Sequence, residues 1–260
     1  MKKTCVVLAL AGLMAAPKLF AAMSVTLMDD TPGMNSSYSY SQGNGGEFRA
    51  VGDSGLDSVV NWGAYSSATK DTVTALNDGA SWGYGQGLAK PGSEYFQTFC
   101  TELLEEYTPG GLYPVSSIGN NALYDGTGHA VPITLGVAYL YSQFAAGTLG
   151  GYDYNYGAGR SATAGDLQSA IWMLLSETSG TLATWVSNDL TSGLGSNTSA
   201  WTQDANGAYG VEDMTLDNPG LAQDQLVIVV PESTTMIAGA LLLLPFGAST
   251  FKILRKKRSV

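Results

Sequence analysis

Residues 163–177 read Thr-Ala-Gly-Asp-Leu-Gln-Ser-Ala-Ile-Trp-Met-Leu-Leu-Ser-Glu. Three apolar residues follow Gln168 at three, four and seven positions, which is the spacing of one face of an α-helix: Ile171, Trp172 and Leu175. The amide of Gln168 therefore lies on the face that packs against the core. Because a buried amide needs hydrogen-bond partners, the sequence predicts polar partners for Gln168 inside the protein.

Helices and strands are predicted on both sides of Gln168. Thr163 and Asp166 fit a capping box with Asp in place of the usual Glu, so we predict a helix from Thr163 to about Glu177. A second helix is predicted over residues 133–146, just before Gly147. Shorter helices are predicted over residues 98–107 and 181–188, strands over residues 23–28, 58–65, 208–216 and 225–230, and a loop over residues 150–159. These elements predict an α+β fold in which a β-rich part packs with a small helical subdomain.

The composition excludes several classes of protein. The chain has 260 residues, with 12 Lys and Arg, 22 Asp and Glu, one His and two Cys. Residues 23–230 contain 4 basic and 21 acidic residues, a net charge of −17. Such a segment repels nucleic acid, whose binding depends on clustered Lys and Arg, so no nucleic-acid partner is expected. A single His and two Cys exclude a His-rich metal site and a disulfide scaffold, and we expect no metal or cofactor.

The first 22 residues have the three parts of a secretory signal peptide. Lys2-Lys3 forms the positive n-region, residues 6–16 form the apolar core, and Ala21-Ala22 is a small-residue cleavage site. The apolar run is too short for a membrane-spanning helix. We therefore predict an exported protein that loses this segment, and Cys5 with it.

The C-terminal tail, residues 231–260, forms a second three-part pattern together with Val230 just before it. Residues Val230, Pro231 and Glu232 precede an apolar run over residues 236–251, which is followed by a basic cluster over residues 252–258. An apolar segment followed by positive charge stops in a membrane with its positive end in the cytoplasm.

This tail resembles the PEP-CTERM sorting signal of Gram-negative bacteria, which is handled by an exosortase. Ser233 stands where that signal has its second Pro. The resemblance implies a protein of the cell envelope, the outer surface or the extracellular matrix of a Gram-negative bacterium. It also implies an exosortase-type processing enzyme as a partner, and membrane contact through residues 236–254 before any processing.

Once the signal peptide is removed, Cys100 is the only cysteine of an exported protein, and a lone exported thiol calls for an explanation. Three segments, in this order along the chain, resemble the motifs of the bacterial thioester domain of surface adhesins: Phe99-Cys-Thr-Glu102, Ala138-Tyr-Leu-Tyr141 and Leu167-Gln-Ser-Ala-Ile-Trp172. The resemblance spans about residues 95–178.

The resemblance implies that the side chains of Cys100 and Gln168 join in an intramolecular thioester. In this reaction a thiolate attacks a carboxamide, ammonia leaves, and the acyl group stays activated only while water is excluded. Phe99, Ile171 and Trp172 are expected to exclude water. An amine or hydroxyl of a surface protein or polysaccharide then takes the acyl group. Because each site acts once, the resemblance implies an adhesin-like covalent binder and not an enzyme.

The residues alone leave alternatives open. Cys100 and Gln168 also fit a buried structural thiol and a hydrogen-bonded core amide, as in a noncovalent structural protein of the envelope or extracellular matrix. Ser54, Asp125 and His129 follow the chain order of α/β-hydrolases, but no strand-to-helix turn is predicted around Ser54. His129 could instead assist proton transfer at a thioester.

Overall fold

The computed structural model describes residues 23–28, 46–72, 92–105, 110–124, 129–155, 158–217 and 221–230. Its strands are β1 (Met23–Met28), β2 (Glu47–Gly52), β3 (Lys70–Thr72), β4 (Glu94–Phe99), β5 (Leu112–Gly119), β6 (Asn121–Tyr124), β7 (His129–Pro132), β8 (Val211–Asp217) and β9 (Leu221–Ile228). Its α-helices are α1 (Ser54–Asp57), α2 (Leu135–Ala145), α3 (Ala158–Leu174), α4 (Thr184–Leu194) and α5 (Thr198–Trp201). Two short 3-10 helices are η1 (Trp62–Ala64) and η2 (Ala208–Gly210).

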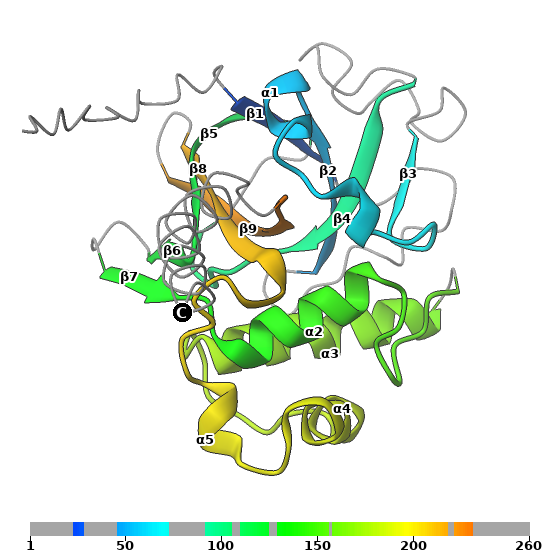
Figure 1. Ribbon diagram of the computed structural model, residues 1–260, viewed down its shortest axis with the longest axis vertical. Helices are drawn as coiled ribbons and strands as arrows, with labels where there is room; N and C mark the ends of the chain where they lie inside the picture. Colours follow the sequence, from blue (N-terminus) through cyan, green and yellow to red (C-terminus); the bar gives the residue numbers. More distant parts are fainter. Residues whose placement is uncertain are drawn as a thin grey trace, which may run out of the picture.

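One antiparallel sheet dominates the described residues, with the strand order β3-β4-β2-β1-β5-β8-β9. The sheet is strongly curved, so that its last strand, β9, returns to the end of β4 (Figure 1). Cys100, the residue after β4, forms an antiparallel bridge with Gln225 of β9. The strands β6 and β7 form a separate two-stranded hairpin. The curvature therefore places Cys100 between two strands that are far apart in the strand order.

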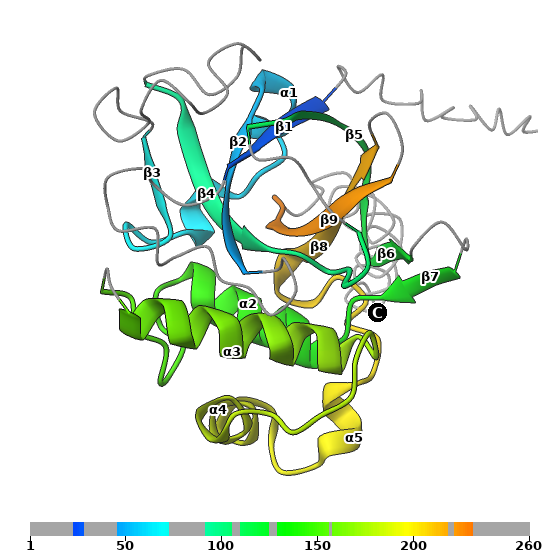
Figure 2. The same ribbon diagram turned by 180° about the vertical axis from the view of Figure 1, so that it is seen from behind.

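The helices α2 to α5 lie beside one end of the curved sheet, whereas the short α1 packs on β1 and β2. α2 and α3 run next to each other, and α4 and α5 form a further layer beyond them (Figures 1 and 2). The N-terminus of α2 is capped by Thr134, whose side chain accepts a hydrogen bond from the Val137 N–H. A Cβ atom on Gly136 would lie 2.9 Å from the carbonyl oxygen of Trp201, so this glycine allows α2 and α5 to approach closely.

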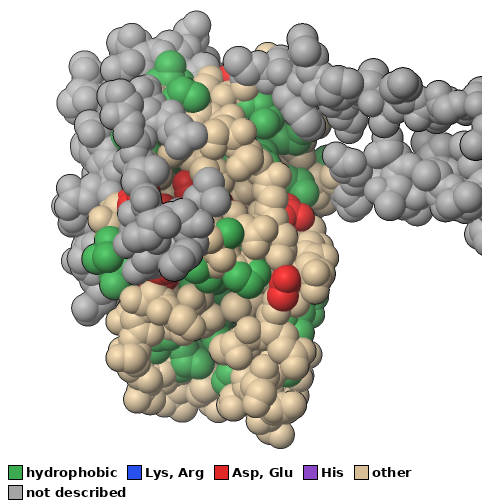
Figure 3. All heavy atoms as spheres, turned by 90° about the vertical axis from the view of Figure 1, so that its left-hand side faces the viewer, with side chains coloured by type: hydrophobic (Ala, Val, Ile, Leu, Met, Phe, Trp, Pro, Cys, Tyr) green, Lys and Arg blue, Asp and Glu red, His purple; other side chains and the backbone are tan. Residues whose placement is uncertain are grey.

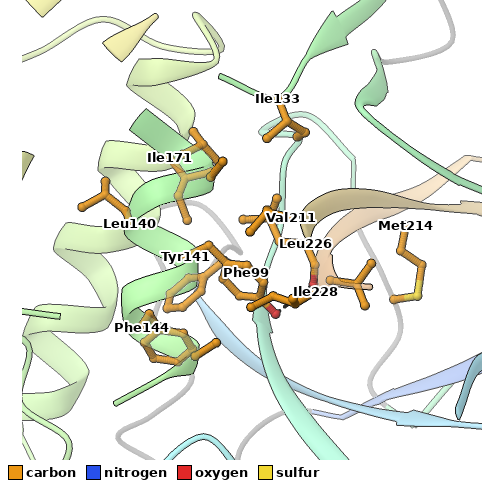
Figure 4. Packing of buried hydrophobic residues seen from close by; sticks show 14 of the residues in the cluster. Phe99, Ile133, Leu140, Tyr141, Phe144, Ile171, Val211, Met214, Leu226 and Ile228 are labelled. Carbon is orange, nitrogen blue, oxygen red and sulfur yellow. Dashed lines mark hydrogen bonds between the residues drawn. The ribbon is translucent and has the colours of Figure 1, made fainter. Parts of the chain in front are cut away.

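The main hydrophobic core fills the space between the sheet and the first layer of helices. Figure 4 shows Tyr141 and Phe144 of α2 pointing toward Phe99 at the end of β4. The rings of Phe99 and Phe144 meet edge-on with centroids 4.9 Å apart. The Tyr141 hydroxyl donates to the carbonyl oxygens of Gln97 and Leu226, at 3.0 Å in each case. These contacts fix the end of β4 relative to both α2 and β9.

The structure confirms the predicted α+β class and most of the predicted elements. β1 and α2 form where residues 23–28 and 133–146 predicted them, and α4 covers most of the short helix predicted over residues 181–188. β8 and β9 overlap the two C-terminal strands that were predicted. The described part of the predicted loop over residues 150–159 is irregular up to Asn155.

Two predicted elements are wrong. Residues 98–107 do not form a helix in the part that is described, because Thr98 and Phe99 belong to β4 and the next residues bind β9. The Thr101 N–H donates to the Asp224 carbonyl at 3.0 Å, and this tertiary hydrogen bond competes with a helical one. Residues 58–65 do not form a strand; they contain a turn, a bridge between Val60 and Val229, and η1.

The helix that carries Gln168 begins at Ala158, five residues before the predicted start, and it ends at Leu174. Thr163 therefore lies inside the helix, and the predicted capping box is wrong. The Thr163 hydroxyl donates to the carbonyl oxygens of Gly159 and Arg160 instead, at 3.2 and 3.1 Å. Arg160, near the start of the helix, forms a tertiary ion pair with Glu47, a contact that a local capping pattern does not contain.

The predicted signal peptide and tail, residues 1–22 and 231–260, lie outside the described residues, as do Pro231 and Glu232 of the predicted sorting motif. Val230 is the last residue described, and its side chain is exposed. Within the ranges described, no helix combines the length and apolar character needed to cross a membrane. Figure 3 shows one face of the molecule, on which a few acidic side chains lie scattered among hydrophobic side chains and uncharged atoms.

Candidate functional site: Cys100 and Gln168

Cys100 lies immediately beyond the pairing of β2 with β4. The last pair of that ladder is Glu47 with Phe99, so Gly46 and Cys100 come next on the two strands. The backbone N–H groups of these two residues do not donate across the β2–β4 pair. Instead, the N–H groups of Gly46 and Cys100 both donate to Oε1 of Gln168, at 3.0 and 3.2 Å. The end of one strand pair thus becomes a two-donor site for a side-chain oxygen from α3.

Gln168 reaches this site from the buried face of α3, as the helical spacing predicted. Its side chain is fully buried, and its amide nitrogen Nε2 donates to the carbonyl oxygen of Cys100 at 2.8 Å. The Cys100 sulfur Sγ lies 3.2 Å from Oε1, close enough for the thiol to donate a hydrogen bond. The structure therefore brings together the two side chains that the sequence singled out, although they are 68 residues apart.

This arrangement is suited to chemistry at the carboxamide carbon of Gln168. Two backbone N–H groups on one carbonyl oxygen form an oxyanion hole, which stabilises the negative charge that develops when a nucleophile attacks the carbon. Oε1 is bonded to that carbon, and the Cys100 sulfur lies 3.2 Å from Oε1, so the thiol is a direct neighbour of the carboxamide group. Nucleophile, electrophile and oxyanion donors are all present in one buried place.

Apolar side chains separate the site from water. Phe48 of β2, Cys100 and Trp172 of α3 form a small cluster apart from the main core, and Leu103 packs against it. Trp172 was predicted to shelter the thiol and does so. Phe99 and Ile171, which were predicted to do the same, belong to the main core instead. Burial raises the pKa of the Cys100 thiol well above its usual value, although the Gly46 N–H lowers it.

The indole N–H of Trp172 is the least satisfied polar group of the cluster. Its nitrogen Nε1 is buried and makes no hydrogen bond among the described residues. It shares a cluster with the Cys100 thiol and lowers the pKa of that thiol slightly. At neutral pH the thiol stays protonated, because the effect of burial on its pKa exceeds that of these donors.

Sequence reasoning missed Gly46, Phe48 and Leu103. Gly46 contributes only its backbone N–H, and a glycine before a strand carries no sequence signal for that role. Its φ of 153° is a value that L side chains rarely adopt, so glycine is required here. Phe48 and Leu103 are apolar residues whose place near the thiol depends on the pairing of β2 with β4 and on the turn after Cys100.

The described residues do not assemble the hydrolase alternative. Ser54 does follow a strand and begins the short helix α1, contrary to the expectation, and its side chain is exposed. Asp53 uses its carboxylate to cap that helix through the Leu56 N–H, at 2.9 Å. Asp125 lies outside the described residues, and for His129 only the backbone, in β7, is described. α1 packs on β1 and β2, whereas β7 pairs with β6.

Glu102, two residues after Cys100, belongs to a group of buried carboxyl side chains that also includes Asp213 and Asp224. Glu102 and Asp224 meet through a hydrogen bond from the Asp224 N–H to the Glu102 carboxylate, at 3.0 Å. Asp213 accepts hydrogen bonds from the Thr101 and Thr215 hydroxyls, at 2.9 and 3.1 Å. Burial, with the nearby charge of Asp224, raises the pKa of Glu102 to about 9 and that of Asp213 well above its usual value. Glu102 therefore carries a proton at neutral pH.

The proton on Glu102 makes the folding stability depend on pH. Glu102 keeps its proton up to about pH 9 in the folded state, whereas in the unfolded chain it loses it near its ordinary pKa of 4.5. The folded state binds more protons in this range, so the free energy of unfolding falls as pH rises from about 4.5 to about 9. In a Cys100→Ala background, which excludes thioester chemistry, we expect the midpoint of thermal unfolding to fall by about 5 °C or more between pH 5 and pH 9.

Circular dichroism melts at several pH values measure this effect. Glu102→Gln removes the titrating group and should make the decrease shallower than that of the parent chain. A Glu102→Gln curve parallel to that of the parent would show that the carboxyl of Glu102 does not hold a proton in the folded state.

No family model, curated protein or solved structure matches the chain. Within the part of the chain that the structure describes, no group of three or more His, Cys, Asp or Glu side chains is arranged to hold a metal ion.

Proposed function

We propose that residues 23–230 form an exported thioester domain that attaches covalently, and once, to a partner carrying an amine or a hydroxyl group. One observation carries the proposal: Oε1 of Gln168 accepts two backbone N–H groups and lies 3.2 Å from the Cys100 thiol. A core amide in a purely structural role needs hydrogen-bond partners, but it does not need a thiol beside its carbonyl group.

The thioester forms in one balanced exchange. The Cys100 sulfur adds to the carboxamide carbon of Gln168, and the new C–S bond replaces the C–N bond. The thiol proton passes to the amide nitrogen, which leaves as ammonia. The Gly46 and Cys100 N–H groups stabilise the negative charge on Oε1 while the carbon is tetrahedral.

Capture follows the same path with a different leaving group. A nitrogen or oxygen of the partner bonds to the acyl carbon of Gln168, and the C–S bond breaks. The proton of the attacking amine or hydroxyl passes to the Cys100 sulfur, whose raised pKa favours the thiol as a product. The partner remains attached to Gln168 through an amide or an ester. Water would react in the same way, which is why the apolar cluster of Phe48, Trp172 and Leu103 matters.

The two ends of the chain supply the proposed location. Residues 1–22 direct export, and residues 231–260, beginning at Pro231 and Glu232, form a PEP-CTERM-like tail for an exosortase-type enzyme. Residues 236–254 contact the membrane before any processing. The proposed targets are a surface protein or a polysaccharide at the envelope of a Gram-negative bacterium, or in its extracellular matrix.

Intact mass spectrometry tests the proposal. Residues 23–230, purified without amines, are expected to weigh about 17 Da less than the sequence, the mass of one ammonia. Methylamine treatment should remove this deficit by adding one molecule to Gln168, while one thiol becomes titratable. An unmodified mass with a titratable thiol in the folded protein would contradict the proposal and favour the noncovalent structural reading.

A further inference from the structure

A buried ion pair connects α3 to the same strands that carry the site. Arg160, in the first turn of α3, donates through Nε to the Glu47 carboxylate at 3.0 Å, and through a second nitrogen to the other carboxylate oxygen. That second nitrogen also donates to the Gln97 side chain of β4. The Tyr152 hydroxyl donates to Glu47 at 2.6 Å. Arg160 and Glu47 are both almost fully buried.

The ion pair and the site are two contacts between the same elements. Glu47 is the neighbour of Gly46, and Gln97 of β4 lies three residues before Cys100. Arg160 precedes Gln168 by eight residues in α3, so the two side chains lie on the same face, about 12 Å apart along the helix axis. A helix held at two points on one face can neither slide nor rotate relative to the strands.

Burying a charged pair is an expensive way to gain stability, because the cost of removing two ions from water offsets most of their attraction. An apolar pair of similar size would pack the same space at least as well. An arginine fork, in which two nitrogens of the planar guanidinium bind the two oxygens of one carboxylate, accepts only a narrow range of geometries. Such a fork between Arg160 and Glu47 therefore fixes the position of α3 relative to β2. Gly46, the neighbour of Glu47, is one of the two donors to Gln168, so a shift of Glu47 would also move a donor of the site.

We propose that Glu47 and Arg160 are positioning residues, which hold the Gly46 N–H on the carbonyl oxygen of Gln168 and so allow the thioester to form. This inference rests on the proposed function. Loss of the fork lets α3 shift relative to β2, the Gly46 N–H moves off Oε1, and the tetrahedral state loses one of its two donors. Shifts of about 1 Å in such geometry slow reactions by about a hundredfold.

Refolding kinetics test the inference. Protein recovered unfolded from inclusion bodies still carries the intact amide, and the growth of the 17 Da deficit after dilution gives the rate of thioester formation. We expect Arg160→Lys, which keeps the charge but loses the fork, and Glu47→Gln to form the bond about ten- to a hundredfold more slowly than the native sequence. Tyr152→Phe removes one hydrogen bond to Glu47, keeps the ion pair, and should slow the reaction by less.

A matched control separates position from stability. Leu190→Ala removes a fully buried side chain from α4, in the outer helical layer, and lowers stability without touching the ion pair or the site. Leu190→Ala should form the thioester at the native rate. If Arg160→Lys, Glu47→Gln and Tyr152→Phe also form it at the native rate, the inference is wrong although the proposed function stands.

A second readout does not depend on the thioester at all. In a Cys100→Ala background, hydrogen exchange at the Gly46 amide reports its hydrogen bond to Gln168. Glu47→Gln should accelerate this exchange by more than its loss of global stability explains. Leu190→Ala should accelerate it by no more than its loss of global stability explains. Absence of the 17 Da deficit in the native sequence would remove the proposed function, whereas unchanged exchange at Gly46 in Glu47→Gln would remove the positioning role.

Discussion

Replacing Gln168 with Glu, or Cys100 with Ala, is expected to abolish both the 17 Da deficit and the methylamine adduct. Glu has the shape of Gln, but its carboxyl group offers no amine leaving group and does not form a thioester spontaneously with a thiol. Ala at position 100 removes the sulfur atom that becomes part of the thioester, so the bond cannot form. Either change should therefore reduce capture below detection by intact mass spectrometry.

The control for these variants is another glutamine on a helix of the same layer. Gln143 of α2 is only partly buried, and its side-chain oxygen accepts a hydrogen bond from the Thr148 hydroxyl at 2.9 Å. Gln143→Glu should keep both the deficit and the adduct. Circular dichroism should show that all three variants are folded. Adduct formation by folded Gln168→Glu would place the acyl group on another residue and would falsify the assignment of the site.

Replacing Gly46 with Ala should slow thioester formation by about 10²-fold or more. An L side chain rarely adopts a φ of 153°, so the backbone must move, and the N–H that donates to Gln168 moves with it. Loss of one donor from an oxyanion hole costs about 10²–10³ in rate. The rate is measured from the growth of the mass deficit during refolding.

Gly165→Ala provides the matched control. Gly165 lies in α3, one turn before Gln168, and a Cβ atom there would meet no other atom within 4 Å. Ala is favoured over Gly inside a helix by about 1 kcal/mol, so this variant should be at least as stable as the native sequence and should form the bond at the native rate. Equal rates for Gly46→Ala and Gly165→Ala would exclude the Gly46 N–H from the reaction.

The sequence predicts the α3 side of the site well and its sheet side poorly. The spacing around Gln168 is a local helical pattern, and it survives because the helix packs one face against the core. Gly46 lies far from Cys100 along the chain, and only the pairing of β2 with β4 brings the two N–H groups to the same oxygen. A backbone donor has no residue-type signal, so no composition or spacing argument reveals it.

The errors in the predicted helices have the same origin. The capping box at Thr163 is a local pattern, but the helix begins where Arg160 can reach Glu47, a contact between residues 113 positions apart. The helix predicted over residues 98–107 has suitable local composition, but Glu102 there binds the backbone of β9. In both places the local prediction fails where buried charged or polar groups make tertiary contacts, and helix propensity is weak enough for tertiary context to override it.

The position of Gln168 in the middle of α3 has a mechanical consequence. Before capture, a thioester to Cys100 would tether the helix to the end of β4 and close a loop of 68 residues, which stabilises the fold by about 4 kcal/mol on a chain-entropy estimate. In the proposed function, capture would exchange that internal tether for an external one. Tension from the partner would then enter the domain through α3 and reach the sheet through helix–sheet contacts as well as through the backbone. The ion pair of Arg160 with Glu47, two turns away on α3, is one of these contacts and would resist shear.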